Sequence, residues 1–332
     1  MVSERALITG GAGFLGLHLG RYLQKKGYKV DLLDNFRRGI KDDDLNSFLL
    51  LPSTRLMEID LLSPKGMSCL DKNYTHVFHF AAIVGVAKVL EAPFEVLSCN
   101  YEMLARILKY ASGLTELKRF VFASTSEVYA GALFHHGLEF PTPETVSLTL
   151  TDLKHPRTSY MLSKIYGEAL CLQSGIPCTI VRPHNLYGPR MGLSHVIPEL
   201  FQRASKLNTN EELDIFSGDD RRTFCYIEDG TSMIGELAES TNSVGEAFNV
   251  GVESPELSIR ELAAKILATV GRVTSIRSGR KTPGSPARRC PSMKKTFATI
   301  SYRPQYSIEL GLAATYAWYK ENVFKATGVS AH

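Results

Sequence analysis

The strongest constraint on the fold is a glycine-rich loop between a short apolar run and a helical pattern. The run Arg5–Thr9 is followed by Gly10, Gly13 and Gly16, spaced G-x-x-G-x-x-G, and then by a helix-like segment over 14–26. Glycine permits a tight turn and a close backbone approach, and the N–H groups that begin a helix favour an anion such as a pyrophosphate. This order predicts the first βα unit of a nucleotide-binding sheet.

Short apolar runs alternate with helical patterns through the first half of the chain. Strands are expected at 30–33, 56–59, 76–80, 120–123 and 178–181, and long helices at Pro93–Ala111 and 159–173. Alternating strands and helices form a parallel sheet covered on both faces. We expect an α/β fold, a Rossmann-type doubly wound parallel sheet with a smaller C-terminal α/β substrate-binding domain.

The domain boundaries follow from the point where this alternation weakens. We expect a nucleotide-binding domain over 1–182, with a return segment at about 224–251. The second domain is expected over 183–223 and 252–332, where helical patterns mix with short extended pieces.

Composition excludes several classes of function. The chain has 332 residues and a net charge of +4, without a basic run interleaved with aromatics, so no nucleic-acid partner is expected. Six cysteines lack metal-ligand spacing, which predicts reduced thiols and no metal site. No apolar stretch approaches the roughly 18 residues that span a bilayer, and the first strand leaves no room for a signal peptide. We therefore expect a cytoplasmic protein with no membrane partner.

An acidic residue ends the second expected strand. Asp34 would accept hydrogen bonds from the adenosine ribose and repel a 2′-phosphate, which favours NAD over NADP. If Arg37 and Arg38 bind that 2′-phosphate, they favour NADP instead. Alternatively, they are solvated loop residues. Asp60 is placed to meet adenine or, alternatively, to cap a helix.

Tyr160 and Lys164 are four residues apart in an expected helix. This spacing puts both side chains on one face, with Cβ atoms about 5–6 Å apart. A lysine held there can lower the pKa of the phenol and bring proton transfer by tyrosine within reach of neutral pH. Together with the upstream nucleotide loop, the pair indicates redox acid–base chemistry.

Taken together, these motifs resemble the extended short-chain dehydrogenases/reductases that modify nucleotide sugars: epimerases, dehydratases and decarboxylases. The matching segments run in the family's order over nearly the whole chain. They are 9–16, 34–36, 79–82, Asn100, 124–129, 160–164, 182–190, 196–198, 222–229 and 289–292. The sequence departs from the usual family pattern at Ala130, where glycine is common, and at Ser292, where aspartate is common.

The resemblance implies a catalytic role for each of four residues. Tyr160 would take the sugar hydroxyl proton, Lys164 would bind the nicotinamide ribose and keep the phenol acidic, and Thr125 would hydrogen-bond the reacting hydroxyl. Glu127 would act near C5 and C6 as a second acid–base or anion-positioning group, with a pKa tuned toward neutral, unless it is only a charged residue at a strand end.

The resemblance also implies two binding sets. The cofactor-binding set is Gly10, Gly13, Phe14, Leu15, Gly16, Asp34, Asn35, Asp60, Leu61, Ala81, Ala82, Asn100, Tyr160, Lys164 and Pro183. The substrate-binding set is Ser126, Asn185, Arg190, Val196, Arg222 and Arg289, with the last two gripping the diphosphate of a UDP-sugar or other nucleotide sugar.

Oxidation at sugar C4 is the first step that the resemblance implies. Thr125-Ser126-Glu127 is more similar to UDP-glucuronate decarboxylases and GDP-mannose 4,6-dehydratases than to typical 4-epimerases, and Arg289-Cys290-Pro291-Ser292 is similar to the decarboxylase pattern. Decarboxylation of a UDP-glucuronate-type substrate is therefore the first expectation, with 4-epimerisation and then 4,6-dehydration as alternatives. A non-catalytic NAD-binding sensor is the alternative of a different class. Relatives pair through two helices, which implies a homodimer through Pro93–Ala111 and 159–173.

Overall fold

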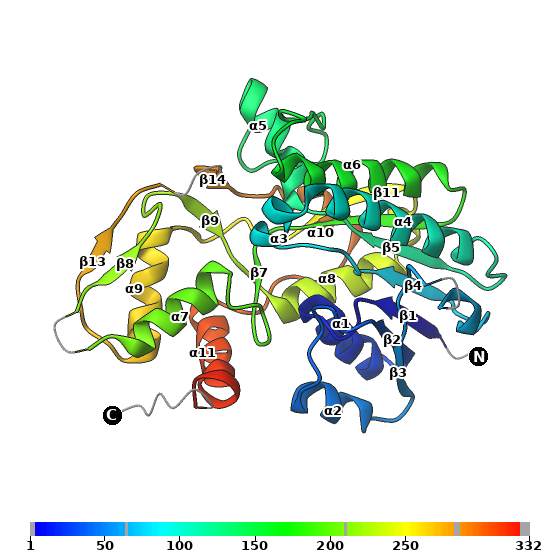
Figure 1. Ribbon diagram of the computed structural model, residues 1–332, viewed down its shortest axis with the longest axis horizontal. Coiled ribbons are helices and arrows are strands. Elements are labelled where there is room, and N and C mark those ends of the chain that lie inside the picture. The colour runs from blue at the N-terminus through cyan, green and yellow to red at the C-terminus, as the bar shows by residue number, and fades with distance from the viewer. Residues whose placement is uncertain (1–3, 64–65, 209–210, 282–285, 326–332) are drawn as a thin grey trace.

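A seven-stranded parallel sheet forms the centre of the protein (Figure 1). The computed structural model describes residues 4–63, 66–208, 211–281 and 286–325. The strands run in the order β11-β6-β5-β4-β1-β2-β3, and every pairing between them is parallel. Their bounds are β1 Arg5–Thr9, β2 Lys29–Asp34, β3 Thr54–Glu58, β4 His76–His79, β5 Arg119–Ala123, β6 Cys178–Pro183 and β11 Glu246–Val250. The doubly wound parallel sheet expected from the sequence is confirmed.

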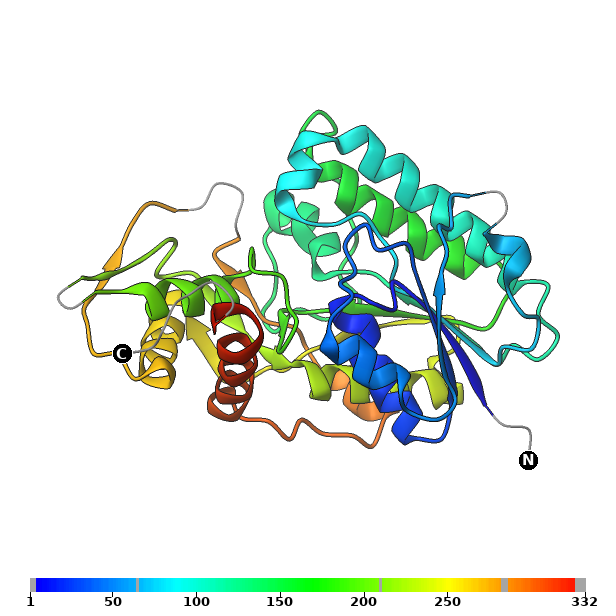
Figure 2. The same cartoon turned by 60° about the horizontal axis from the view of Figure 1, so that its bottom comes forward.

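Helices cover both faces of this sheet (Figures 1 and 2). Helices α4 (Pro93–Ala111) and α6 (Arg157–Gln173) lie together on one face, and α1 (Phe14–Lys25) and α8 (Ile227–Glu239) lie on the other. Successive side chains of a strand point to opposite faces of the sheet, so each strand contributes side chains to the hydrophobic core on each face. In β1, Leu7 packs into the core under α4, whereas Ile8 packs into the core under α1. This double burial explains why the strands read as continuous apolar runs.

Smaller sheets lie to one side of the main sheet. Strand β9 (Arg221–Thr223) pairs with β12 (Glu256–Ser258) and with β14 (Arg288–Arg289). Three helices accompany them, α7 (Val196–Lys206), α9 (Ile259–Val270) and α11 (Ile308–Tyr319). Two-stranded pairs complete this part: β7 (Leu186–Tyr187) with β10 (Cys225–Tyr226), and β8 (Leu213–Ile215) with β13 (Ile276–Ser278). The division into two domains at the expected residues remains a prediction.

Element boundaries differ modestly from expectation. Helix α4 begins and ends as expected, whereas α6 begins at Arg157, two residues before the expected start at 159. Among the described residues, four short helices were not expected from the sequence: α2 (Asp43–Leu49), α3 (Val86–Glu91), α5 (Ala130–His136) and α10 (Lys294–Thr299). Helices of this length span too few turns to show a periodic apolar pattern. Among the described residues, no helix combines the length and the apolar character needed to cross a membrane.

Candidate functional site

The glycine-rich loop joins β1 to α1 at the carboxyl edge of the main sheet. Gly10 has a φ of +69°, and a Cβ there would lie 2.8 Å from the Ala81 nitrogen. A Cβ on Gly16 would lie 2.2 Å from the Gly10 carbonyl oxygen. Gly13 is the N-cap of α1 and brings no side-chain cap, so the N–H groups of the first turn remain available to an anion. The loop therefore has the close-packed backbone and the exposed helix start that a pyrophosphate needs.

Asp34 is tied to this loop by hydrogen bonds. Its carboxylate accepts the Ala12 N–H at 3.0 Å and the Phe36 N–H at 2.8 Å. Burial raises the pKa of Asp34, against the opposing effect of these hydrogen bonds and of Arg190. The carboxylate therefore lies at the end of β2, beside the glycine loop, where a ribose that follows the pyrophosphate would pass.

The other cofactor candidates lie at neighbouring strand ends. The Asn100 side chain accepts the Ile83 N–H at 2.7 Å and donates to the Ile83 carbonyl at 3.1 Å, which fixes the chain after β4. The Ala81 N–H donates to Thr9 Oγ1 at 3.3 Å. Asp60 Oδ1 accepts the Leu62 N–H at 2.8 Å, a local turn contact that leaves its other oxygen available. The remaining candidates are partly buried (Phe14, Leu15, Ala82 and Pro183), buried (Leu61) or exposed (Asn35).

Arg37 and Arg38, the two arginines that could bind the 2′-phosphate of NADP, have different surroundings. Arg37 forms an ion pair with Glu95 of α4. Arg38 lies close enough to Tyr160 for its positive charge to act on that phenol. The guanidinium of Arg37 thus binds the Glu95 carboxylate and does not lie beside Asp34.

Arg190 lies at the glycine loop. Its guanidinium donates to Asp42 at 2.7 Å and to the Ala12 carbonyl at 3.3 Å, and the side chain is buried. The structure therefore does not place Arg190 among the neighbours of Glu127, where Arg222 and Arg289 lie. In this position Arg190 braces the loop, and a direct role in substrate binding stays a prediction.

Tyr160 and Lys164 lie on one face of α6, but their electrostatics differ from expectation. The Lys164 ammonium donates to the Ala123 carbonyl at 2.7 Å and lies 5.8 Å from the Tyr160 ring centroid. Burial and the charge of Glu127 raise the pKa of Tyr160 to about 12, against a hydrogen bond with Thr125 that lowers it. Burial lowers the pKa of Lys164 to about 8. Lys164 is not among the groups that shift the pKa of Tyr160 here, and its role in keeping this phenol acidic stays a prediction.

Thr125 and Glu127 follow β5 in a short helical turn (Ser126–Tyr129). Thr125 caps this turn, because its Oγ1 accepts the Glu127 N–H at 3.2 Å. Glu127 forms an ion pair with Arg289, and Arg157 lies 3.7 Å away. The pKa of Glu127 is lowered because these arginines outweigh its burial. The expectation of a carboxyl tuned up toward neutral pH is therefore wrong, and Glu127 is an anion held by cations.

Arg222 and Arg289 come together through strand pairing. They are register partners in the parallel pair β9–β14, so their side chains leave neighbouring strands side by side. Arg222 is buried, contacts Asp220 at 3.4 Å, and acts electrostatically on Glu127. The structure thus brings both arginines toward the Thr125–Glu127 segment rather than toward the glycine loop.

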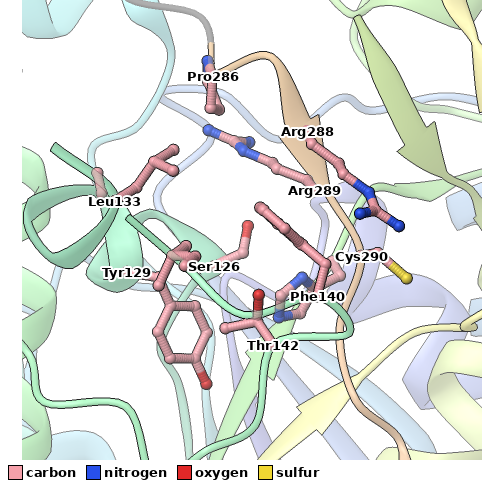
Figure 3. Close-up of a pocket in the computed structure, with 12 residues that line it drawn as sticks. Ser126, Tyr129, Leu133, Phe140, Thr142, Pro286, Arg288, Arg289 and Cys290 are labelled. Atoms are coloured by element: carbon pink, nitrogen blue, oxygen red, sulfur yellow. The ribbon is translucent and has the colours of Figure 1, made fainter. Parts of the chain in front are cut away.

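Ser126 and Arg289 line one small cavity of about 30 Å³ (Figure 3). Leu133 and Phe140 give it an apolar wall, and His184 lines it as well. Of the other substrate candidates, Asn185 has a φ of +42° and its amide donates to the Thr223 carbonyl at 2.9 Å. Val196 is the first residue of α7 and is partly buried.

Arg157 is the site residue that the sequence analysis missed. It is the first residue of α6, three residues before Tyr160, and therefore on the same helix face. The expected helix began at 159, which left Arg157 in a loop and outside this face. The signal that could have found it was the i, i+3 spacing of a cation and the candidate base.

The chain is similar over most of its length to a known protein family and to curated proteins. The model of the NAD-dependent epimerase/dehydratase family matches residues 6–251. A UDP-N-acetyl-α-D-glucosaminuronate decarboxylase from Bacillus cytotoxicus is 32% identical, over 96% of this chain and 99% of that protein.

Two solved structures share the fold. A dTDP-glucose 4,6-dehydratase from Streptomyces venezuelae, solved with NAD, superposes with a TM-score of 0.83 at 25% identity, over 98% of this chain and 100% of that one. A mutant UDP-glucuronic acid 4-epimerase from Bacillus cereus was solved with NAD and a fluorinated UDP-glucuronic acid. It superposes with a TM-score of 0.79 at 26% identity, over 96% of this chain and 99% of that one.

Proposed function

Because this chain belongs to the NAD-dependent epimerase/dehydratase family, we propose that it decarboxylates a UDP-glucuronate-type nucleotide sugar after oxidation at C4. The chain is an NAD-dependent enzyme of the extended short-chain dehydrogenase/reductase group. The glycine loop, the start of α1 and Asp34 fit the pyrophosphate and the ribose of that cofactor.

The chain's own residues support an oxidation at C4. Thr125 hydrogen-bonds the reacting hydroxyl, and Tyr160 takes its proton as the C4–H bond breaks. NAD, when bound, accepts the hydride from C4 and returns it in the same cycle. For Tyr160 to accept a proton near neutral pH, its pKa has to fall from the value of about 12 that it has in this arrangement. Positive charge near the ring acts in this direction, as that of Arg38 does.

The C4 ketone prepares the loss of the C6 carboxylate. The C5–C6 bond breaks, its electron pair passes into an enolate conjugated with the ketone, and CO2 leaves. C5 then takes a proton from water and the C4 oxygen regains the proton held by Tyr160, so that reduction of C4 gives a UDP-pentose. No NAD is consumed over the cycle. Glu127 is ionised and held by Arg289, so it orients cations near C5 and C6 and does not itself donate this proton.

One observation carries the choice of decarboxylation. Glu127 lies two residues after Thr125, acts electrostatically on Tyr160, and forms an ion pair with Arg289. A 4-epimerase needs only C4 oxidation and rotation of the keto-sugar, whereas decarboxylation needs a cationic group at the far side of the sugar. The similarity to the Bacillus cytotoxicus decarboxylase supports the same choice.

Arg289→Gln tests this assignment. Oxidation at C4 should survive, because Thr125, Tyr160 and Lys164 are untouched, while CO2 release falls by about a hundredfold or more. A single-turnover assay that follows absorbance of the reduced cofactor and CO2 separately would show the reduced cofactor accumulating. Equal loss of both signals would contradict the assignment. Arg203→Gln, which removes an arginine from a surface pair on α7 with Glu199, is the matched control.

Epimerisation at C4 is the second candidate. Its support is that Thr125 and Tyr160 alone suffice for it, together with the similarity to a UDP-glucuronic acid 4-epimerase. Product analysis separates the two reactions, since epimerisation retains the C6 carboxylate. A 4,6-dehydratase would instead release water, and a non-catalytic NAD-binding sensor would turn over none of these sugars.

We also propose a homodimer formed through α4 and α6. These helices pack side by side on the sheet and expose large apolar side chains: Phe94 is 84% exposed, Tyr101 44% and Tyr166 46%. Exposed apolar clusters of this kind favour an interface between chains. Light scattering at micromolar concentration should give twice the chain mass, and Tyr166→Asp should shift it to one chain mass. A monomeric wild-type protein would refute the dimer.

A further inference from the structure

A buried ion pair lies behind the segment that carries Thr125. Glu168 of α6 accepts two hydrogen bonds from the Arg182 guanidinium of β6, at 2.9 and 2.6 Å, and both side chains are buried. The attraction within a buried ion pair offsets the cost of dehydration only where further hydrogen bonds satisfy the remaining donors and acceptors. Two such hydrogen bonds join this pair to residues on either side of Thr125.

These two hydrogen bonds hold both ends of the segment. Ser124, directly before Thr125, donates its hydroxyl hydrogen to Glu168. Tyr129, which ends the turn after Thr125, accepts a hydrogen bond from Arg182 at 2.8 Å. Ser124 and Tyr129 are 5% and 3% exposed, so water does not compete for these contacts. The backbone of Thr125 therefore lies between two fixed points.

The hydroxyl of Tyr129 has a second partner in β11. It donates to Asn249 Oδ1 at 2.9 Å. The Asn249 amide group donates to the carbonyls of Thr142 and Ser292 at 3.0 and 3.1 Å, so Oδ1 is left as the acceptor. The Tyr129 hydroxyl thus accepts from Arg182 and donates to Asn249, and a phenylalanine at this position would lose both contacts.

The same ion pair belongs to the helix that carries Tyr160. Tyr160, Lys164 and Glu168 follow one another at intervals of four residues in α6, so their side chains lie along one face. Lys164 donates to the Ala123 carbonyl at the end of β5. Thr125 and Tyr160 share a hydrogen bond, and its geometry therefore depends on how α6 is held against the segment that follows β5.

We propose that Ser124 and Tyr129 are positioning residues for the oxidation at C4. Through the buried ion pair they set the Thr125 hydroxyl against the Tyr160 phenol. The inference rests on the proposed function, because oxidation at C4 is the step that needs both hydroxyls at one substrate oxygen. Decarboxylation, epimerisation and dehydration share that step. A displacement of about 1 Å at a reacting group can cost about a hundredfold in rate, so small changes at the two anchors should reach the chemistry.

Ser124→Ala and Tyr129→Phe each break one anchor and leave Thr125 and Tyr160 in place. With the NAD-loaded enzyme and UDP-glucuronate, each substitution should lower kcat by about tenfold or more and leave KM within about twofold. Because hydride transfer then limits the rate, UDP-glucuronate deuterated at C4 should show a larger kinetic isotope effect in both variants than in wild type.

Tyr74→Phe is the matched control. Tyr74 directly precedes β4, at the amino edge of the sheet, and its buried hydroxyl donates to Asp31. This substitution should lower the free energy of unfolding and leave kcat within about twofold. If Ser124→Ala and Tyr129→Phe also lose stability but keep the kcat and isotope effect of wild type, their role is only structural and the inference is refuted.

A second readout needs no turnover of a sugar. Burial raises the pKa of Tyr160 and the hydrogen bond with Thr125 lowers it, so the loss of an anchor should raise it further. A difference titration at 295 nm on NAD-loaded Ser124→Ala, with and without Tyr160→Phe, isolates the Tyr160 signal. That signal should lie at a pH about 0.5 or more above the signal of the matching wild-type pair.

The outcomes separate this inference from the proposed reaction. If wild type epimerises UDP-glucuronate and releases no CO2, decarboxylation fails, and the lowered kcat of the two variants still supports the anchors. If wild type releases CO2 and both variants match it in kcat, the anchors are refuted and decarboxylation stands. If wild type turns over no sugar, the titration decides: a raised Tyr160 signal in Ser124→Ala supports the anchors, and an unchanged signal refutes them.

Discussion

The ammonium of Lys164 donates to the carbonyl of Ala123 at 2.7 Å and lies 5.8 Å from the centre of the Tyr160 ring. The lysine is therefore held by the end of β5 and by its own burial, beside the phenol and not on its hydroxyl. This places a positive charge next to the candidate base without fixing the base in its ionised form.

The first prediction concerns the protonation of Tyr160. Its pKa is raised to about 12 in this arrangement, so the phenol stays protonated through pH 10 in the cofactor-free protein. A difference titration at 295 nm between wild type and Tyr160→Phe should show no tyrosinate signal from this residue below pH 10. Addition of NAD should move the signal to lower pH, because the bound nicotinamide brings positive charge. A phenolate signal near pH 7 without cofactor would contradict the electrostatics described.

A second prediction concerns the pH dependence of stability at Lys164. Burial lowers the pKa of Lys164 from 10.5 to about 8, so between these values the unfolded state binds more protons than the native state. The free energy of unfolding contributed by this group therefore rises with pH across that window and is lowest below pH 8. The free energy of unfolding of wild type, measured relative to that of Lys164→Met, should rise by about 2–3 kcal/mol between pH 7.5 and pH 10.5. Urea unfolding at both pH values measures this, and a difference that does not change with pH would refute it.

A third prediction is that Gly16→Ala weakens NAD binding. A Cβ at residue 16 would lie 2.2 Å from the Gly10 carbonyl, which forces the loop backbone to move. We expect affinity for NAD to fall by about a hundredfold, as for loss of several backbone contacts to a phosphate. Gly113→Ala is the matched control, because its nearest neighbour would be the Tyr110 carbonyl at an ordinary 3.5 Å. NAD affinity retained in Gly16→Ala would count against a pyrophosphate site in this loop.

A fourth prediction concerns a buried ion pair behind the site. Arg182 donates to Glu168 at 2.6 Å, both side chains are about 5% exposed, and Ser124 also donates to Glu168. Glu168→Gln leaves Arg182 without its counter-charge, so the free energy of unfolding should fall by about 3–5 kcal/mol. Glu199→Gln, in a surface pair with Arg203 at 3.2 Å, should cost less than about 1 kcal/mol. If denaturant unfolding gave equal losses of unfolding free energy for Glu168→Gln and Glu199→Gln, burial would not determine the cost of breaking these ion pairs.

The sequence was most informative where structure is local. The glycine loop, the apolar strand runs and the spacing of Tyr160 and Lys164 depend on neighbouring residues, and the structure has each of these elements at or within two residues of its expected position. Helix α4, with its proline at the first position, was predicted to the residue.

The electrostatics of the site could not be predicted, because they depend on residues far apart in the chain. Glu127 meets Arg289, 162 residues away, through the return of β14 beside β9. Arg190 reaches Asp42 across 148 residues, which explains why its position at the glycine loop was not foreseen. The burial that raises the pKa of Tyr160 likewise arises only once the sheet, α6 and the Thr125–Glu127 turn have assembled.

The most direct measurement is product analysis of UDP-glucuronate turned over by the purified enzyme with catalytic NAD. Proton NMR should show a UDP-pentose that lacks the C6 carboxylate, with one CO2 released per product and no net gain of reduced cofactor. A UDP-uronate with inverted C4, water loss, or reduced cofactor formed in proportion to product would contradict decarboxylation as the function of this chain.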